Sequence, residues 1–492
     1  MTLNIKPNKL LKVLILPISL VLMSFVIRFI ALLQTDFGNG WDAYFYLIQI
    51  KALLTEGRMH STDVSLIYPY LLLFKLVILD YIIAYKSAIA LISGFYVLSF
   101  YLLAKVVLTD KNNYINALFI ASFALFSPTI TYMASQFPKN LLGLVLFNFF
   151  LIYWFKNKRW AIILFFVLTF FTHRLTAGVI MIFVVLQLLN KRRFLWITII
   201  GIVLLLLSLV LPGLIHLYDI ERFRDVFSVK LQFAPLSFIR LLGVEKIGYY
   251  WIAEIIVLFI ILMITIVSLI FYRQHIKPYL QKFYFILIFI SFVLLFPFYK
   301  FDINGPALRF FLSFLCIAPL FLLFISEKIS KPIKIAFICI LMASSLVSYR
   351  TYSPKKIDPP YKIYSKITEK TALLLKNNDF DIIIAHKGLA EYFTFNTGID
   401  ALPWQPEDKY LIEKTWRISS GISLRDFKYY LTTEVTDSIK KVGINYFLLP
   451  ESLWLRFIKL VKQRDDLNLS NIVYSDENPY KMRPPYLMKG KK

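Results

Sequence analysis

One carboxylate, Asp42, stands at the start of a predicted helix just after the first long apolar segment of the chain. The spacing of the neighbouring apolar residues predicts an amphipathic helix at a membrane interface, with the apolar side formed by Trp41, Tyr44, Phe45, Ile48 and Ala52. Gly57 is expected to end this helix. Because helix amides favour an anion at this position, Asp42 is either a simple N-cap or a carboxylate that does chemistry.

Other charged residues are predicted on the same side of the membrane as Asp42. They stand near the outer ends of helices or in outer turns, at Arg28, Lys139, His173, Arg174, Glu254, Asp302 and Arg309. Each alone is explained as an interfacial anchor that reaches toward water. Charges at membrane depth are costly, however, so their joint placement is informative. A carboxylate among several cations at the outer leaflet would suit a phosphate-bearing lipid.

The composition is that of a polytopic membrane protein. Hydrophobic residues make up 58% of the 492 residues, and the mean hydropathy is +0.66. The formal charge of +25 lies in short clusters between apolar runs, which sets membrane orientation and argues against nucleic-acid binding. Both cysteines fall inside apolar segments, so no disulfide is predicted. Lysines precede an apolar run without a cleavage site, which predicts a retained first helix and a cytoplasmic N-terminus.

Apolar runs and basic clusters together predict about eleven crossings of the membrane. The predicted spans are 11–33, 86–108, 114–131, 138–155, 160–172, 175–190, 194–215, 249–271, 280–299, 306–325 and 332–349. The run 66–83 is short and interrupted, so we interpret it as interfacial or re-entrant within a first outer loop, residues 34–84. A second outer loop is expected at 132–139. Residues 1–350 are thus predicted to form the transmembrane domain.

An odd number of crossings predicts that residues 351–492 lie outside the cell membrane. The composition turns polar and proline-rich from Tyr352, which is typical of a domain boundary. Buried strands are predicted at 381–385 and 444–449, and helices at 361–376, 388–394 and 451–463. These elements predict a small extracytoplasmic α/β domain.

Common motifs of soluble enzymes are absent from the sequence. It contains no Walker loop, no GxGxxG after a strand, no His-Glu-x-x-His and no Cys-x-x-Cys. Five histidines are too scattered for a metal cluster. No cofactor is therefore predicted, and a divalent metal is not supported.

The first outer loop resembles that of the GT-C superfamily of polytopic glycosyltransferases, through Asp42, Phe45-Tyr46, Ala52 and Gly57. This superfamily includes protein mannosyltransferases, the aminoarabinose transferases of lipid A and the catalytic subunit of oligosaccharyltransferase. The resemblance implies a GT-C-like fold, a polyprenyl-phosphate sugar donor, a catalytic aspartate at the position of Asp42 and often a soluble exterior C-terminal domain.

Two features depart from the superfamily pattern. Many members carry a second acid in the second outer loop, whereas residues 132–140 here contain none. A metal held by two carboxylates is therefore not expected. The C-terminal segment, residues 351–492 (the tail), also lacks the Trp-Trp-Asp-Tyr-Gly run of oligosaccharyltransferases. N-glycosylation of proteins is not predicted for that reason.

The favoured hypothesis is a glycosyltransferase of the plasma (inner) membrane that moves a hexose or pentose from a polyprenyl-phosphate donor to a lipid, glycan or protein hydroxyl. Asp42 is the candidate base, acting with inversion at the anomeric carbon. The candidate cations for the donor phosphate are Lys139, Arg174 and Arg309. Candidate assisting residues are Asp36, which is also the second choice of base, His173 and Asp302.

Two other functions are kept open. A polymerase or ligase of surface polysaccharide would be favoured if the predicted outer loop 216–248 held the essential residues, among them Arg222, Arg224 and Arg240. A lipid or solute transporter ranks third, because transporters often show repeated halves and polar groups at the bilayer midplane, which this sequence does not display.

Overall fold

The computed structural model describes two separate parts of the chain. Its described residues are 15–61, 63–108, 113–188, 306–324, 326–327, 329–351, 358–359, 361–362, 364–365, 368–369, 383–385, 387–399, 401–403, 446–449, 472–474 and 486–489. Internal contacts divide the chain into a first unit, Met1–Asn39 with Ser61–Ile357, and a second unit, Gly40–His60 with Asp358–Lys492. Among the described residues, the first unit carries helices, and the second carries a sheet and helices.

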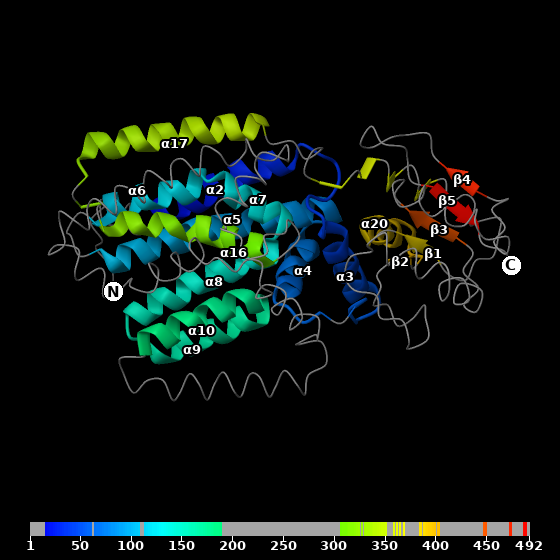
Figure 1. Cartoon of the computed structure of the whole chain (residues 1–492), viewed down its shortest axis with the longest axis horizontal. Coiled ribbons are helices and arrows are strands. Elements are labelled where there is room, and N and C mark those ends of the chain that lie inside the picture. The colour runs from blue at the N-terminus through cyan, green and yellow to red at the C-terminus, as the bar shows by residue number, and fades with distance from the viewer. Residues whose placement is uncertain are drawn as a thin grey trace, which may run out of the picture. The chain divides into compact units, whose positions relative to one another are not determined.

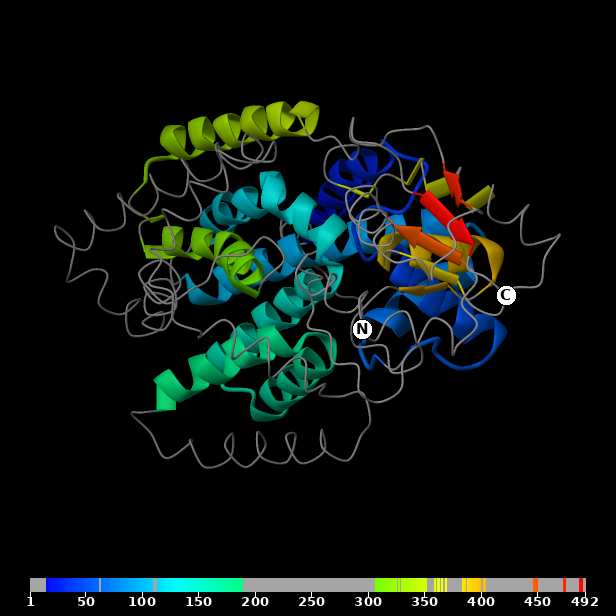
Figure 2. The same ribbon diagram turned by 45° about the vertical axis from the view of Figure 1, so that its right-hand side comes forward.

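The first unit is a bundle of apolar helices. Its elements are α2 (Leu16–Leu32), α4 (Ile67–Val77), α5 (Tyr81–Val107), α6 (Asn113–Phe126), α7 (Pro128–Gln136), α8 (Pro138–Phe155), α9 (Arg159–Thr172), α10 (Arg174–Leu188), α16 (Pro306–Ile317), the 3₁₀ helix η2 (Ala318–Phe324) and α17 (Lys331–Thr351). Helix α5 packs against α2, α6 and α8, and is buried along most of its length. Helices α8, α9 and α10 pack against one another and run side by side in both views (Figures 1 and 2).

Serine and proline break the predicted span 114–131. Helix α6 ends at Phe126, and the next helix begins after Ser127, whose hydroxyl accepts from the Ile130 amide at 3.3 Å. Pro128 occupies the first turn of α7, a position that proline suits. The two helices meet at 52°. The predicted loop 132–139 is therefore wrong over residues 132–136, which are helical and buried.

Several helices of the first unit have the length and composition of membrane spans. Among the described residues, α5 and α8 qualify alone, and the bent pair α6–α7 qualifies as a third. Helices α2, α9, α10 and α17 lie within or close to the predicted spans but do not meet the same criteria of length and composition, and α2 and α9 are apolar but shorter than 18 residues. The predicted spans 194–215, 249–271 and 280–299, and the loop 216–248 with its arginines, lie outside the described residues. The total of about eleven crossings therefore stays a prediction.

Helix α2 shows why this unit belongs in a lipid environment. Four of its exposed side chains recur at every fourth position, namely Ile18, Leu22, Val26 and Ile30. Residues spaced by four share one helix face, so the exposed stripe is continuous and apolar. A stripe of this kind is unfavourable in water and favourable against lipid tails. The chain is thus a helical membrane protein.

The second unit contains a mixed five-stranded sheet of order β2-β1-β3-β5-β4. The strands are β1 (Ile383–Ala385), β2 (Ala401–Pro403), β3 (Tyr446–Leu449), β4 (Ile472–Tyr474) and β5 (Tyr486–Lys489). Strand β1 runs parallel to both β2 and β3, whereas β5 runs antiparallel to β3 and β4. Helix α20 (Lys387–Thr397) connects β1 to β2 as a βαβ crossover.

The predicted strands and one predicted helix of the tail are confirmed. Strands β1 and β3 lie within 381–385 and 444–449, and α20 covers 388–394. The predicted helix 451–463 lies outside the described residues, and 361–376 is described only in part. The placement of this tail outside the membrane stays a prediction.

Helix α3 (Ala43–Thr55) belongs to the second unit, where it packs against α20. The helix lies where the first-loop pattern predicts it. Every residue from Tyr46 to Ile50 is buried, however, so the buried side chains do not form one face. This differs from the amphipathic helix expected from sequence, because aromatic rings of the tail pack on it. The ring of Tyr44 lies 4.8 Å from that of Tyr361 and 4.7 Å from that of Tyr392.

Candidate functional site

Three of the cations selected from sequence gather around one histidine of the first unit. His173 occupies the turn between α9 and α10, and Arg174 is the first residue of α10. Lys139 stands in the first turn of α8, and Arg309 in the first turn of α16. The charges of all three act on the His173 imidazole. Helix starts from different parts of the chain therefore bring these side chains together.

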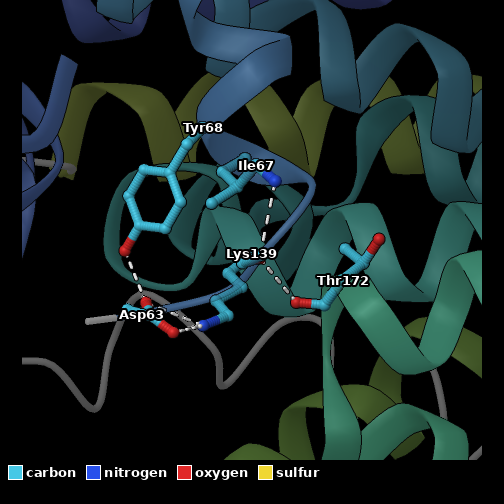
Figure 3. Close-up of polar contacts among 6 residues, drawn as sticks. Asp63, Ile67, Tyr68, Lys139 and Thr172 are labelled. Atoms are coloured by element: carbon cyan, nitrogen blue, oxygen red, sulfur yellow. Dashed lines mark hydrogen bonds and ion pairs between the residues drawn. The ribbon is translucent and has the colours of Figure 1, made fainter. Parts of the chain in front are cut away.

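Hydrogen bonds fix the segment before α4 against the end of α9. The Ser65 hydroxyl donates to the Thr172 carbonyl at 2.9 Å, and the Leu66 amide donates to the Phe171 carbonyl at 3.1 Å. The residues ahead of Ser65 are thereby held close to the turn that carries His173 and Arg174. Figure 3 shows Thr172 of this junction together with Ile67, Asp63 and Lys139.

Asp63 is the member of the cluster that sequence reasoning missed. The Lys139 amine donates to both carboxylate oxygens of Asp63 at 3.0 Å, and the Tyr68 hydroxyl donates to the same group (Figure 3). Burial alone would raise the pKa of Asp63, but the charge of Lys139, the bonds from Tyr68 and Lys139 and the charge of Arg174 hold that pKa below its usual value. Asp63 is therefore ionised at neutral pH. Its contacts with Lys139 join segments that are 76 residues apart, so residue spacing carries no signal for it.

His173 is a neutral imidazole that contacts the first turn of α10. The Thr176 amide donates to His173 Nδ1 at 3.3 Å, which makes this nitrogen an acceptor and the side chain an N-cap of α10. The Thr176 hydroxyl lies 2.8 Å from the same nitrogen. Burial, then the charges of Arg309, Lys139 and Arg174, hold the pKa of His173 well below its usual value. The side chain is therefore an uncharged polar group beside three cations.

Buried polar side chains connect three helices under the cluster. The Thr176 hydroxyl donates to Asn140 Oδ1 at 3.2 Å, and Asn140 Nδ2 donates to the Ser313 hydroxyl at 3.3 Å. Ser313 in turn donates to the Arg309 carbonyl at 2.7 Å. This chain of bonds links α10, α8 and α16. It fixes the helix starts on which the cations stand.

Gly143 permits the close approach of α8 to the His173 turn. A methyl group at Gly143 would lie 2.9 Å from the Cβ of His173 and 2.9 Å from the Thr176 hydroxyl. We expect Gly143→Ala to lower the unfolding free energy by about 1 to 3 kcal/mol, because the two segments must separate. Thermal unfolding in detergent measures this effect.

Gly178→Ala is the matched control for that prediction. A methyl group at Gly178 meets nothing within 4 Å, and this residue also lies in a helix. Alanine is the better helix former, so the control is expected to gain up to about 1 kcal/mol. Equal melting temperatures for the two variants would contradict the tight contact at Gly143.

The lowered pKa of His173 predicts an acid-sensitive fold. Below about pH 6.5 the unfolded chain binds a proton at this residue that the folded chain does not, so stability falls as the pH falls. The expected slope is at most about 1.4 kcal/mol per pH unit. Melting temperatures from pH 7 to pH 5 measure it. His173→Gln should remove the slope, whereas the same change at the exposed His60 should keep it.

The aspartates selected from sequence lie in different environments. Asp42 takes the N-cap position of α3 and is half-buried, but its side chain accepts no capping hydrogen bond. The explanation of Asp42 as a simple cap is therefore not supported. Asp42 belongs to the second unit. Asp36 is exposed in the turn after α2, and Asp302 lies outside the described residues.

Arg28 corrects another expectation from sequence. The predicted interfacial anchor is fully buried, and its guanidinium donates to carbonyls at the break between α6 and α7. The bonds run to the carbonyls of Ala124 at 3.0 Å, Ser127 at 3.2 Å and Leu125, and to the Ser24 hydroxyl at 3.3 Å. Carbonyls at a helix end carry partial negative charge, which a cation offsets. Arg28 is therefore a structural residue.

Metal ligands are not grouped in the part of the chain that the structure describes. No set of three or more His, Cys, Asp or Glu residues within these ranges is placed to hold a metal ion. Asp63, the carboxylate of the cluster, is engaged by Lys139 and Tyr68.

Comparison with solved structures identifies the class of fold. No family model and no curated protein sequence matches this chain. The fold is similar to that of solved membrane-protein structures. Two similar structures are those of ArnT from Cupriavidus metallidurans, one bound to undecaprenyl phosphate and one in the apo state. Each has a TM-score of 0.55 and 10% sequence identity, and the match covers 96% of this chain and 97% of that chain.

Proposed function

We propose that this protein is a membrane glycosyltransferase that moves a sugar from a polyprenyl-phosphate donor to an acceptor hydroxyl. The observation that carries the proposal is the convergence of Lys139, Arg174 and Arg309 around a buried, neutral His173. The fold supports it, since a structure of similar fold, ArnT, holds undecaprenyl phosphate.

The charge of the cluster suits a phosphate monoester or diester. Among the residues that the structure describes, the cluster combines three cations with one carboxylate, Asp63, and this combination favours an incoming anion. Arginine binds phosphate oxygens in a planar fork, and lysine does so as a point charge. The neutral His173 adds a hydrogen bond to phosphate without adding charge. Lys139 exchanges part of its contact with Asp63 for a phosphate oxygen in this scheme.

The proposed reaction is a displacement at the anomeric carbon. The Asp42 carboxylate takes the proton of the acceptor hydroxyl, and the acceptor oxygen forms the new bond to that carbon. The bond from the anomeric carbon to the phosphate oxygen breaks, and its electron pair leaves with polyprenyl phosphate. The cations stabilise the charge that develops on this leaving group. The configuration at the sugar is inverted.

The membrane supplies the donor in this proposal. The polyprenyl tail lies in the bilayer, where the apolar exposed stripe of α2 also belongs. We place the N-terminus in the cytoplasm and the tail domain, residues 351–492, outside an inner or plasma membrane. The acceptor is a lipid, glycan or protein that reaches the outer face.

Binding of a phosphate-bearing lipid tests the proposal. The full chain in lipid nanodiscs should bind undecaprenyl phosphate and should bind undecaprenol, which lacks the phosphate, at least about 10-fold more weakly. Lys139→Met and Arg309→Met should remove most of this preference. Lys156→Met, at an exposed residue of the same unit, is the matched control and should keep it.

A second experiment measures sugar transfer. The protein is mixed with undecaprenyl-phosphate sugars and membrane acceptors, and the undecaprenyl phosphate that is released is quantified. Release that depends on the chain supports the proposal. Equal binding of undecaprenol and undecaprenyl phosphate, together with no release, would overturn it.

A further inference from the structure

The backbone just before Asp42 is held by two side chains of the distant tail. Gly40 has a left-handed conformation with φ of 98°, which residues with a side chain rarely adopt. Its amide donates to Asp358 Oδ1 at 2.9 Å, and its carbonyl accepts from the Tyr361 hydroxyl at 2.6 Å. These partners lie 318 and 321 residues further along the chain. Both polar groups of Gly40 are therefore fixed by one short segment.

That segment is itself rigidly placed within the second unit. Asp358 is buried, and only 3% of Tyr361 is exposed. The Tyr361 ring packs against Tyr44 at 4.8 Å and against Tyr392 at 5.9 Å. Tyr44 is also in edge contact with Tyr392. Asp42 thus lies between two anchored positions, Gly40 on one side and Tyr44 on the other.

The direction of the Asp42 carboxylate depends on this backbone. The Asp42 carbonyl accepts the first helical bond, from the Tyr46 amide at 3.1 Å, so the backbone that carries the carboxylate is fixed both by α3 and by Gly40. A general base must lie about 2.6 to 3.2 Å from the proton that it takes. A displacement of about 1 Å can lower the rate by about 10²-fold. Bonds at Gly40 are therefore well placed to control catalysis.

We propose that Asp358 and Tyr361 are positioning residues that aim the Asp42 carboxylate. The inference rests on the proposed function, in which Asp42 is the base, and adds two tail residues to it. They touch neither the sugar nor the phosphate in this scheme. They act only through the Gly40 backbone.

Steady-state kinetics of the full chain test the inference. Tyr361→Phe removes one hydroxyl, and Asp358→Ala removes the acceptor for the Gly40 amide. Each should lower kcat by about 10- to 100-fold and leave the KM for the undecaprenyl-phosphate sugar within about twofold. Asp358→Asn should recover most of the activity that Asp358→Ala loses, since its amide oxygen still accepts from Gly40. Tyr364→Phe, in the same aromatic cluster, is the matched control and should keep kcat.

A second variant and a parallel measurement separate the possible failures. Gly40→Ala strains the same backbone without changing the tail, and should reproduce the fall in kcat if Tyr361→Phe folds poorly. Asp42→Asn is assayed beside them. If Asp42→Asn keeps full activity, the proposed function fails. If Asp42→Asn is inactive while Tyr361→Phe and Asp358→Ala keep kcat within twofold per folded molecule, the positioning inference is overturned and the proposed function stands.

Discussion

Replacement of Asp42 by asparagine is expected to lower the turnover of sugar transfer by about 10²- to 10⁴-fold, which is the usual contribution of a general base. Asparagine has nearly the same shape but takes no proton from the acceptor hydroxyl. Because the Asp42 side chain does not cap α3, the melting temperature should stay close to that of the wild type. The release of undecaprenyl phosphate measures turnover, and binding of the same lipid shows that the cation cluster is intact.

Asp36→Asn is the control for that variant. Asp36 is also an aspartate of the first outer loop, but it is exposed and lies outside the motif that resembles GT-C enzymes. The control is expected to keep activity within a few-fold. A fall in stability of about 1 kcal/mol for Asp42→Asn with unchanged turnover would instead indicate a cap, and would remove Asp42 from the mechanism.

Removal of Arg28 is expected to have the largest effect on stability. Arg28→Met keeps much of the apolar volume but leaves the carbonyls at the α6–α7 break without their charged donor. Each buried carbonyl that is left without a donor costs about 1 to 3 kcal/mol, and three carbonyls lose theirs. Thermal unfolding in detergent should show a lower melting temperature and less folded protein.

Arg58→Met is the matched control, because 82% of the Arg58 side chain is exposed and its ion pair with Glu56 lies at the surface. Surface pairs contribute about 1 kcal/mol or less, so this variant should melt close to the wild type. A similar loss of stability in both variants would show that the bonds of Arg28 are not what holds the break together.

Much of the helical architecture follows from local patterns in the sequence. Apolar runs of sufficient length predict α5 and α8, and three- and four-residue spacing predicts α3. The short buried strands β1 and β3 are also predicted correctly. The apolar runs at β4 and β5 have three residues each, Ile472–Tyr474 and Tyr486–Met488, whereas those at β1 and β3 have four. Local sequence therefore indicates elements but not all their partners.

The cation cluster is predictable for a physical reason. Lys139, Arg174 and Arg309 all stand at helix starts on one predicted side of the membrane, so topology alone places them near a common level. Asp63 and Arg28 depend instead on packing between distant segments. The carboxylate of Asp63 is recognisable only once α4, α8 and α10 are assembled, and Arg28 only once the α6–α7 break is known. Long-range contacts of this kind leave no trace in residue spacing.

The make-up of the second unit has a consequence for biosynthesis. Residues 40–60 leave the ribosome early, but their partners begin at Asp358, after roughly 300 further residues. At about 5 to 20 residues per second, that interval lasts about 15 to 60 s. During this time the tail can offer neither Asp358 nor Tyr361 to Gly40. If Asp358 and Tyr361 position Asp42 as we propose, a nascent chain has no aligned Asp42, and activity begins only after the intervening segments have been synthesised.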